Sequence, residues 1–256
     1  MKLKISLLSG AGNTFHIVQE TADLGLANNH ERKRIIAKEV CLKWPADGFI
    51  FLQNNHTGLE WTFFNNDGSD AEMCGNATRC VGYFMKNIVQ DLKLNWNLKT
   101  VAGLIKISAL AEEKFQVIMT PLIQLQSELG FFCNTGVPHL VLVIDDISKA
   151  KGFYSKSQEL RNHHQFFPAG TNVTYAQKTA QENYVKAVSY ERGVEDFTAA
   201  CGTGALAVAF YNYANHKIIE TNVEMPGGML IMNLANLNQP TMVGSAILLE
   251  SYDYEI

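Results

Sequence analysis

The chain has 256 residues, 47% of them hydrophobic and 18% charged, which is enough apolar material for one large packed domain or two small ones. Its formal net charge of −4 argues against a surface that binds nucleic acid or anionic lipid, and its 14 Phe, 9 Tyr and 3 Trp argue against disorder. No apolar run approaches the roughly 20 residues of a membrane span, and the opening segment MKLKISLLSG lacks the apolar length and cleavage site of a signal peptide. We therefore expect a cytoplasmic protein that has neither nucleic acid nor membrane as a partner.

Short β-branched and aromatic runs, often bounded by Asn, Gly, Asp or Pro, predict strands along the whole chain. In chain order these runs are LKISLL (3–8), GFIFLQ (48–53), EWTFFN (60–65), FQVIMT (115–120), HLVLVI (139–144) and AILLES (246–251). Between the first two runs, residues 31–44 predict an amphipathic helix, because Ile36, Val40 and Trp44 recur every four residues.

Two further predicted helices, 75–88 and 202–216, are apolar on nearly every face. A helix without a polar face is enclosed by protein on all sides. We therefore expect an α/β (α+β) fold of two pseudo-symmetric domains, each a curled, mostly antiparallel sheet around one central helix.

An internal repeat relates these two helices. Residues 67–84 (DGSDAEMCGNATRCVGYF) align without a gap with residues 194–211 (VEDFTAACGTGALAVAFY), so that an acidic stretch leads into Cys-Gly in both. The alignment places Cys74 and Cys201 equivalently in the two halves, each just before a helix.

A cysteine at a helix start has a favoured thiolate, because the N–H groups and the positive end of the helix dipole point at it. The glycine after each cysteine lets a ligand approach the backbone, whose next N–H groups can hold a carboxylate. Each half thus offers one reactive thiol beside one anion site, and two halves face to face would place both thiols on one ligand.

Two thiols on opposite sides of one carbon suit racemisation. One thiolate removes the α-proton, the other thiol returns a proton from the opposite side, and the roles exchange with direction. This reaction requires no cofactor, and we expect none.

The remaining three cysteines are expected to be buried core residues: Cys41, Cys80 and Cys133. The odd cysteine count argues against a disulfide framework, and the spacing argues against a structural zinc site, so we expect no metal.

The segments FFNNDGSDAEMCGNATRC (63–80) and ERGVEDFTAACGTGA (191–205) resemble the two signatures of diaminopimelate epimerase, a pyridoxal-independent family that interconverts LL- and meso-diaminopimelate. SGAGNTF (9–15), DGFIFL (47–52), TGVPHLV (135–141), FPAGTNVTY (167–175), MPGGMLIM (225–232) and GSAILLES (244–251) resemble further family segments in the same order. The resemblance thus spans almost the whole chain. It implies an isomerase of lysine and cell-wall precursor biosynthesis with a small amino-acid substrate, and a homodimer as a possible assembly.

The resemblance also implies the domain organisation. The first half comprises residues 1–117 together with about 245–256 and carries Cys74, and the second comprises 118–244 and carries Cys201. The active site is expected in the cleft between them.

Three groups of site residues follow from the resemblance. The two catalytic cysteines and the two residues that assist their proton exchange are Cys74, Cys201, His139 and Glu191. The residues whose backbone cradles the reacting carboxylate are Gly75, Asn76, Gly202 and Thr203. The residues that hold the rest of the substrate are Asn13, Asn65, Asn172 and Arg192. Arg192 is expected on the distal carboxylate, because a guanidinium forms two parallel hydrogen bonds with a carboxylate.

The chain departs from the family pattern at four positions: Thr14, Ala77, Val137 and Phe197. Val137 replaces the usual Asn before Pro-His and removes a polar substrate contact. An alternative therefore stays open, namely a racemase or isomerase of another polar amino acid on the same scaffold.

Two other classes of function are also open. A thiol–disulfide redox protein would cycle a disulfide between Cys74 and Cys201, which would inactivate an epimerase. A catalytically silent binding protein of the same fold would have no use for two thiols.

Overall fold

The structure is a computed structural model that describes residues 2–26, 29–56, 58–71, 73–101 and 103–256. The chain divides into two compact units, Met1–Val117 with Gly244–Ile256, and Ile118–Val243. Within the described part of the chain, no helix is long and apolar enough to cross a membrane.

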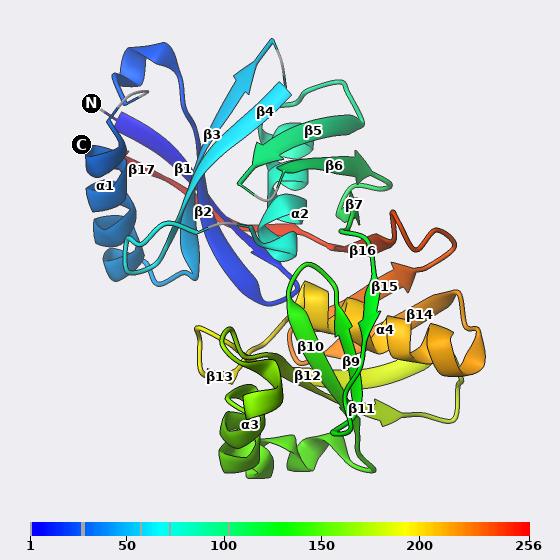
Figure 1. Ribbon diagram of the computed structural model, residues 1–256. Helices are drawn as coiled ribbons and strands as arrows, with labels where there is room; N and C mark the ends of the chain where they lie inside the picture. Colours follow the sequence, from blue (N-terminus) through cyan, green and yellow to red (C-terminus); the bar gives the residue numbers. More distant parts are fainter. Residues whose placement is uncertain (1, 27–28, 57, 72, 102) are drawn as a thin grey trace. The chain divides into compact units, whose positions relative to one another are not determined.

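The first unit contains most of the strands from the N-terminal half and the last strand of the chain (Figure 1). Its strands are β1 (Lys2–Gly10), β2 (Asn13–Gln19), β3 (Gly48–Asn55), β4 (Gly58–Asn65), β5 (Asn95–Thr100), β6 (Gly103–Ala109), β7 (Lys114–Ile118) and β17 (Ile247–Glu255). Its helices are α1 (His30–Lys43), α2 (Gly75–Tyr83), the short 3-10 helix η1 (Ala22–Leu24) and the π-helical turn η2 (Phe84–Ile88) that continues α2.

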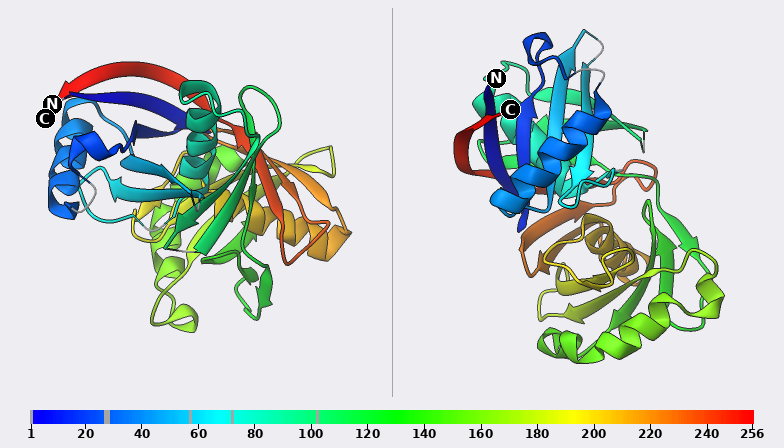
Figure 2. Two further views of the ribbon diagram at one scale, coloured as in Figure 1. Left: turned by 90° about the horizontal axis from the view of Figure 1, so that it is seen from above. Right: turned by 90° about the vertical axis from the view of Figure 1, so that its left-hand side faces the viewer.

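Strand β3 explains how this unit holds two helices. Alternate strand residues point to opposite faces. Phe49 and Phe51 pack with the buried face of α1, whereas Ile50 and Leu52 belong to the cluster that includes Val81 of α2. The two helices therefore cover opposite faces of the sheet around β3, as Figures 1 and 2 show.

The second unit repeats this construction. Its strands are β8 (Ile123–Leu125), β9 (Phe131–Asn134), β10 (Pro138–Val143), β11 (Asn172–Lys178), β12 (Tyr184–Glu191), β13 (Asp196–Phe197), β14 (Glu220–Met225), β15 (Gly228–Asn233) and most of β16 (Thr241–Ser245). Its helices are α3 (Tyr154–Arg161), α4 (Gly202–His216) and the 3-10 helices η3 (Ile147–Phe153) and η4 (His164–Phe166).

Helix α4 is the centre of the second unit. It contacts β9, β10, β11, β12, β14 and β15, and every residue from Gly204 to Phe210 is buried. The right-hand view of Figure 2 shows it almost end-on with strands of its unit around it. The predicted enclosure of this apolar helix is confirmed, and α2 is likewise buried at seven of its nine residues.

The two units share one order of strand pairing. In the first, β1–β2, β2–β3, β3–β4, β4–β5 and β5–β6 are antiparallel, parallel, antiparallel, parallel and antiparallel. In the second, β9–β10, β10–β11, β11–β12, β12–β14 and β14–β15 follow the same sequence. Helices α2 and α4 occupy the same place in this order, so the predicted fold class of two similar α+β halves is confirmed.

All six predicted strands and the three predicted helices are present, and the amphipathic helix begins at His30 and ends at Lys43. The sequence patterns did not predict α3 or strands such as β5 and β14. These two strands read N-W-N-L-K-T and E-T-N-V-E-M, with polar residues on the outer face, so their apolar content is too low to stand out.

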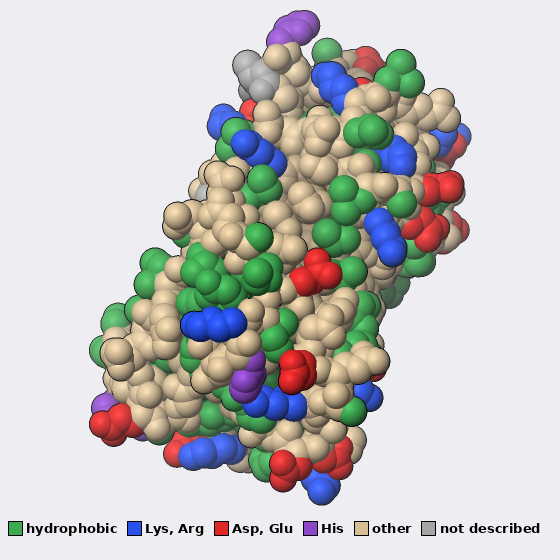
Figure 3. Space-filling model, turned by 90° about the vertical axis from the view of Figure 1, so that its right-hand side faces the viewer, with side chains coloured by type: hydrophobic (Ala, Val, Ile, Leu, Met, Phe, Trp, Pro, Cys, Tyr) green, Lys and Arg blue, Asp and Glu red, His purple; other side chains and the backbone are tan. Residues whose placement is uncertain are grey.

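Charged side chains are mixed on the surface. On the face drawn in Figure 3, basic and acidic groups are interspersed among hydrophobic and neutral polar ones. This distribution agrees with the small net charge of the chain.

Candidate active site

The candidate site of the first unit is built at the start of α2. Cys74 has extended backbone angles and is the residue immediately before the helix, and its carbonyl accepts the first helical hydrogen bond from the Thr78 N–H. The N–H groups of the first turn point toward the helix start, where no earlier carbonyl can accept them. Gly75 and Asn76 are therefore placed as a cradle for an anion beside a half-buried thiol.

Asn13 and Asn76 are both predicted site residues, and a hydrogen bond links their side chains. The Asn76 amide donates to Asn13 Oδ1 at 2.6 Å, and Asn76 Oδ1 accepts from the Arg79 guanidinium at 2.8 Å. The guanidinium has no lone pair, so it fixes which end of the Asn76 amide is the acceptor. Asn13 is then an acceptor toward Asn76 and keeps its own N–H groups for another partner.

Arg79 was missed by the sequence analysis. It is fully buried and also donates to the carbonyls of Gly75 and Ser245. Burial lowers the pKa of Arg79 to about 10, which leaves it a cation at neutral pH. The signal in the sequence was an arginine within an otherwise apolar helix.

Asn65 lies at the same edge of this sheet. Asn13 begins β2, and Asn65, the last residue of β4, pairs with Gly48 at the start of β3. The Asn65 amide donates to Ser69 Oγ at 3.0 Å, so it is held by the loop that leads toward Cys74. Strand starts and ends thus bring Asn13 and Asn65 to the edge near the start of α2.

The candidate site of the second unit is built in the same way at the start of α4. Cys201 precedes the helix with extended backbone angles, and its sulfur lies 3.4 Å from the Gly204 nitrogen and 3.4 Å from Thr203 Oγ1. Burial and the negative charge of Glu191 raise the pKa of Cys201 well above its ordinary value, and the hydrogen bond from the Gly204 N–H opposes this. Cys201 is therefore a thiol at neutral pH in this environment.

Glu191 is the last residue of β12 and lies next to Cys201. Burial raises the pKa of its carboxyl group, while hydrogen bonds with the Thr198 hydroxyl and the Cys201 thiol lower it. The carboxyl group and the thiol thus share a partly dry environment in which a proton can pass between them.

His139 is the second residue of β10 and pairs in parallel register with Asn172 at the start of β11. Its Nδ1 lies 2.9 Å from Thr174 Oγ1, and its Nε2 lies 2.9 Å from Thr203 Oγ1. Burial, followed by the charge of Arg192, lowers the pKa of His139 to about 3. The imidazole is therefore neutral, and Thr203 joins it to the Cys201 sulfur.

Asn172 and Arg192 are adjacent in this unit. Asn172 Oδ1 accepts from the Arg192 backbone N–H at 2.8 Å, and Asn172 Nδ2 lies 3.2 Å from His139 Nε2. The Arg192 side chain donates to the Ala169 carbonyl at 3.1 Å and remains partly exposed.

The sequence-predicted residues therefore form two groups, one in each unit. The first contains Cys74, Gly75, Asn76, Asn13 and Asn65, and the second contains Cys201, Gly202, Thr203, His139, Glu191, Asn172 and Arg192. Their roles, and the expectation that both groups face one ligand, stay predictions.

The three remaining cysteines are buried, as predicted. Burial raises the pKa of Cys41 and of Cys133 to about 12 and that of Cys80 further, so these thiols are unreactive. Among the residues that the structure describes, no group of three or more His, Cys, Asp or Glu could hold a metal ion.

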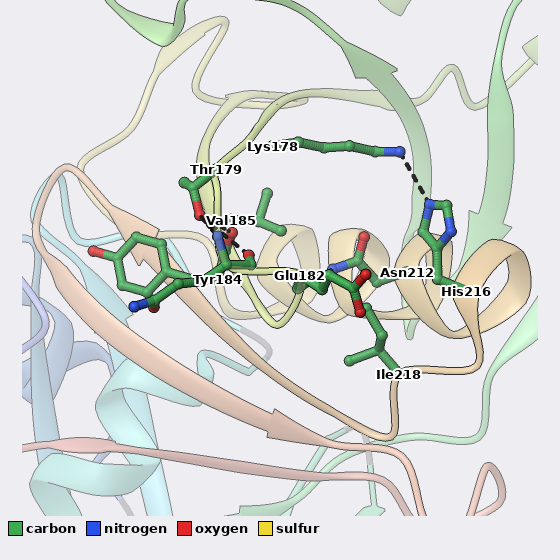
Figure 4. Close-up of a pocket in the computed structure, with 9 residues that line it drawn as sticks. Lys178, Thr179, Glu182, Tyr184, Val185, Asn212, His216 and Ile218 are labelled. Carbon is green, nitrogen blue, oxygen red and sulfur yellow. Dashed lines mark hydrogen bonds between the residues drawn. The ribbon is translucent and has the colours of Figure 1, made fainter.

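A cavity of about 220 Å³ lies near the other end of α4. Figure 4 shows Lys178 and His216 pointing toward one another at its rim, with 3.0 Å between Lys178 Nζ and His216 Nε2. Asn212 is buried beneath them and donates to the Glu182 carbonyl. None of the predicted site residues lines this cavity.

Comparison with known proteins identifies the family. The model of the diaminopimelate epimerase family matches residues 5–123 and 131–249, and so both halves of the chain. The chain belongs to the diaminopimelate epimerase family. This match confirms the family that was predicted from the segments around Cys74 and Cys201.

Relatives within this family are similar over most of their length. A protein named diaminopimelate epimerase from Aquifex aeolicus is 35% identical over 227 residues, which cover 80% of each chain. One of the same name from Methanocella arvoryzae is 34% identical over 257 residues, which cover 90% of this chain and 89% of that protein. Among solved structures, a phenazine biosynthesis protein of the PhzF family from Bacillus anthracis has a TM-score of 0.77 at 14% identity, covers all of both chains and shows the fold alone.

Proposed function

We propose that this chain interconverts LL- and meso-diaminopimelate without a cofactor, by passing the α-proton between substrate and two cysteines, Cys74 and Cys201. The observation that carries the proposal is that both cysteines directly precede topologically equivalent helices in a chain of the diaminopimelate epimerase family. One sulfur removes the α-proton as a thiolate, and the other delivers a proton to the opposite face of the same carbon as a thiol.

The surroundings of Cys201 suit the role of general acid in one direction of the epimerisation. Its raised pKa keeps its proton on sulfur until the substrate carbanion takes it. Cys74 then serves as the base, because the start of a helix favours an anion. In the reverse direction the two sulfurs exchange roles, and Glu191 next to Cys201 receives or returns its proton.

The first turns of α2 and α4 supply the stabilisation that the intermediate needs. Removal of the α-proton moves negative charge onto the substrate carboxylate. Backbone N–H groups at Gly75, Asn76, Gly202 and Thr203 would hold that carboxylate and stabilise the charge as it develops.

The remaining polar groups suit the rest of a diamino diacid. Arg192 is assigned to the distal carboxylate, and its partly exposed guanidinium retains donors beyond the one used on Ala169. Asn13, Asn65 and Asn172 are neutral donors and acceptors that orient ammonium and carboxylate groups.

Val137 favours one alternative. An apolar residue in place of the family's asparagine removes a polar contact, so a different polar amino acid on the same scaffold is the second candidate substrate.

The mechanism requires both thiols to stay reduced. We therefore propose the cytoplasm, where thiols are kept reduced, as the place of action, and lysine and cell-wall precursor biosynthesis as the role.

The test is α-proton exchange. Purified protein, freed of metal and pyridoxal compounds, is incubated in deuterated water with LL- or meso-diaminopimelate, and deuterium at the α-carbon is measured. We expect exchange with inversion by the unaltered protein and a loss of about 100-fold or more in Cys74→Ala and in Cys201→Ala.

Cys41→Ala is the matched control, because it removes a buried thiol from the core of the first unit. It should keep normal turnover. Normal turnover of either catalytic variant would contradict the two-cysteine mechanism. Exchange with another amino acid but not with diaminopimelate would select the alternative substrate, and activity that required a disulfide would select the redox function.

A further inference from the structure

Two buried hydroxyl groups form a chain of contacts from the Nδ1 side of His139. Thr174 of β11 and Ser189 of β12 are directly opposite in the antiparallel register, and neither has exposed surface. Thr174 Oγ1 lies 2.9 Å from His139 Nδ1 and 2.9 Å from Ser189 Oγ. The neighbours Val173 and Tyr175 point into the core on the opposite face of β11, so Thr174 faces α4.

The hydrogen bonds of Asn172 show which nitrogen of His139 carries the proton. A backbone N–H is only a donor, so the oxygen that accepts from Arg192 N must be Asn172 Oδ1. The Asn172 amide N–H group therefore points at His139 Nε2, 3.2 Å away. Nε2 must present its lone pair, and in a neutral imidazole the hydrogen is then on Nδ1, from which it is donated to Thr174.

This tautomer also decides the direction of the Thr203 hydroxyl. Thr203 Oγ1 lies 2.9 Å from His139 Nε2, which presents a lone pair, so the hydroxyl proton is donated to the imidazole. The oxygen then turns its lone pairs toward the Cys201 sulfur, 3.4 Å away, and donates no proton that would stabilise a thiolate there. With the opposite tautomer, Thr203 would accept from Nε2–H and could donate its proton to the sulfur, which would favour the thiolate.

We propose that Thr174 and Ser189 are positioning residues of the active site. They hold His139 in the tautomer with hydrogen on Nδ1, and through it they direct the Thr203 hydroxyl so that Cys201 rests as a thiol. Neither residue touches substrate, and both act through His139.

The start of α4 is shaped around this pair. A Cβ atom at Gly204 would overlap Ser189 Oγ and lie 3.1 Å from Thr174 Oγ1 and 3.2 Å from the Cys201 sulfur. Only a glycine lets the helix start approach the two hydroxyls and the thiol so closely. The hydroxyl pair, the histidine and the cysteine therefore form one packed cluster.

The tautomer follows from geometry alone, whereas its effect on turnover rests on the proposed function. The experiment separates the two. Nitrogen–proton correlation NMR of protein with isotope-labelled histidine shows which ring nitrogen carries hydrogen, and His139→Asn assigns the His139 signals by their loss. Epimerisation kinetics are measured on the same samples.

Thr174→Val removes the hydroxyl and keeps the branched shape. We expect the Nδ1–H form to lose its excess over the other tautomer, and kcat to fall about 10-fold or more with little change in KM, because general acid–base catalysis contributes roughly 100- to 10,000-fold. Thr174→Ser restores a hydroxyl and should restore both properties.

Thr221→Val is the matched control. Thr221 is a fully buried threonine of the same unit, and its hydroxyl has no hydrogen-bond partner among the described residues. The control should keep the His139 tautomer and kcat. If Thr174→Val does not fold, Ser189→Ala carries the same expectation.

The outcomes are distinct. Hydrogen on Nε2 of His139 in the unaltered protein overturns the inference whatever the activity. An unchanged tautomer and unchanged kcat in a folded Thr174→Val or Ser189→Ala also overturn it. Absence of diaminopimelate exchange by the unaltered protein refutes the proposed function, while the NMR spectra still decide the positioning of His139.

Discussion

His139 has no exposed surface, and its ring nitrogens contact neutral groups, the hydroxyls of Thr174 and Thr203 and the amide of Asn172. A protonated imidazole in this place would lose its hydration and would face two donors at Nε2. Burial and Arg192 therefore hold its pKa at about 3, and His139 is an acceptor of a hydrogen bond at neutral pH rather than a cation.

This lowered pKa predicts how stability depends on pH. The unfolded chain binds the proton near the ordinary histidine value of 6.5, whereas the folded chain resists it until about 3, so stability is fully present above pH 6.5 and is lost as pH falls toward 3. Between pH 7 and 4.5 His139 should account for about 2–3 kcal/mol of lost unfolding free energy.

Urea unfolding followed by circular dichroism at the two pH values measures this loss. In His139→Gln the difference between the two pH values should be smaller by that amount, even though the variant is less stable at both. An equal difference in the variant and the unaltered protein would show that another group is responsible.

At the scale of elements, the starts of α2 and α4 organise both halves of the candidate site. Each helix is immediately preceded by a cysteine, which ends the loop that follows β4 or β13. The first turn of α2 packs directly against the backbone of β1 at Gly10. A Cβ atom at Gly10 would lie 2.6 Å from the Asn76 carbonyl oxygen. The position of Asn76 thus depends on β1 as well as on its own helix.

Gly10→Ala should push the first turn of α2 away from β1. We expect a loss of about 1–3 kcal/mol of unfolding free energy, typical of an overpacked core, and a reduced rate of epimerisation because Asn76 moves relative to Asn13. Thermal unfolding by circular dichroism and the exchange assay measure the two effects.

Gly152→Ala is the control for this substitution, since a Cβ atom at Gly152 meets nothing within 4 Å. It should change neither property. A Gly10→Ala protein as stable and active as the control would mean that α2 and β1 have room to separate.

At the scale of the whole molecule, the last strand returns to the first unit. β17 pairs with β1 along its length, and Tyr252 of β17 donates its hydroxyl to His16 Nδ1 at 2.9 Å. His16 is buried, and its Nε2–H donates to the Trp44 carbonyl, so Nδ1 is left as the acceptor. The three tryptophans of the chain, Trp44, Trp61 and Trp96, all belong to this unit, so tryptophan fluorescence reports on it alone.

Tyr252→Phe should remove the partner of a buried nitrogen and lower the stability of the first unit by about 1–3 kcal/mol. Tyr254→Phe on the same strand is the matched control, because the Tyr254 hydroxyl donates to Glu39 at an exposed position and should matter little. Urea unfolding followed by tryptophan fluorescence compares them. Equal stability of the two variants would contradict a structural role for the bond to His16.

Features that depend only on neighbouring residues could be predicted from the amino-acid sequence. Apolar side chains on nearly every face of residues 75–88 and 202–216 indicate enclosed helices, and a cysteine followed by glycine precedes each of them. The family signatures around Cys74 and Cys201 are local for the same reason. These patterns were enough for the fold class and for the candidate site residues.

The groups that the site residues contact could not be predicted in this way, because these contacts form only in the folded chain. Thr174 and Ser189 are polar residues at buried strand positions, which is a signal in the sequence, but their link to His139 depends on the pairing of β10, β11 and β12. Arg79 likewise reaches the Ser245 carbonyl only when α2 is enclosed. The protonation state of a buried group is set by everything packed around it, and packing joins residues that are far apart in the chain.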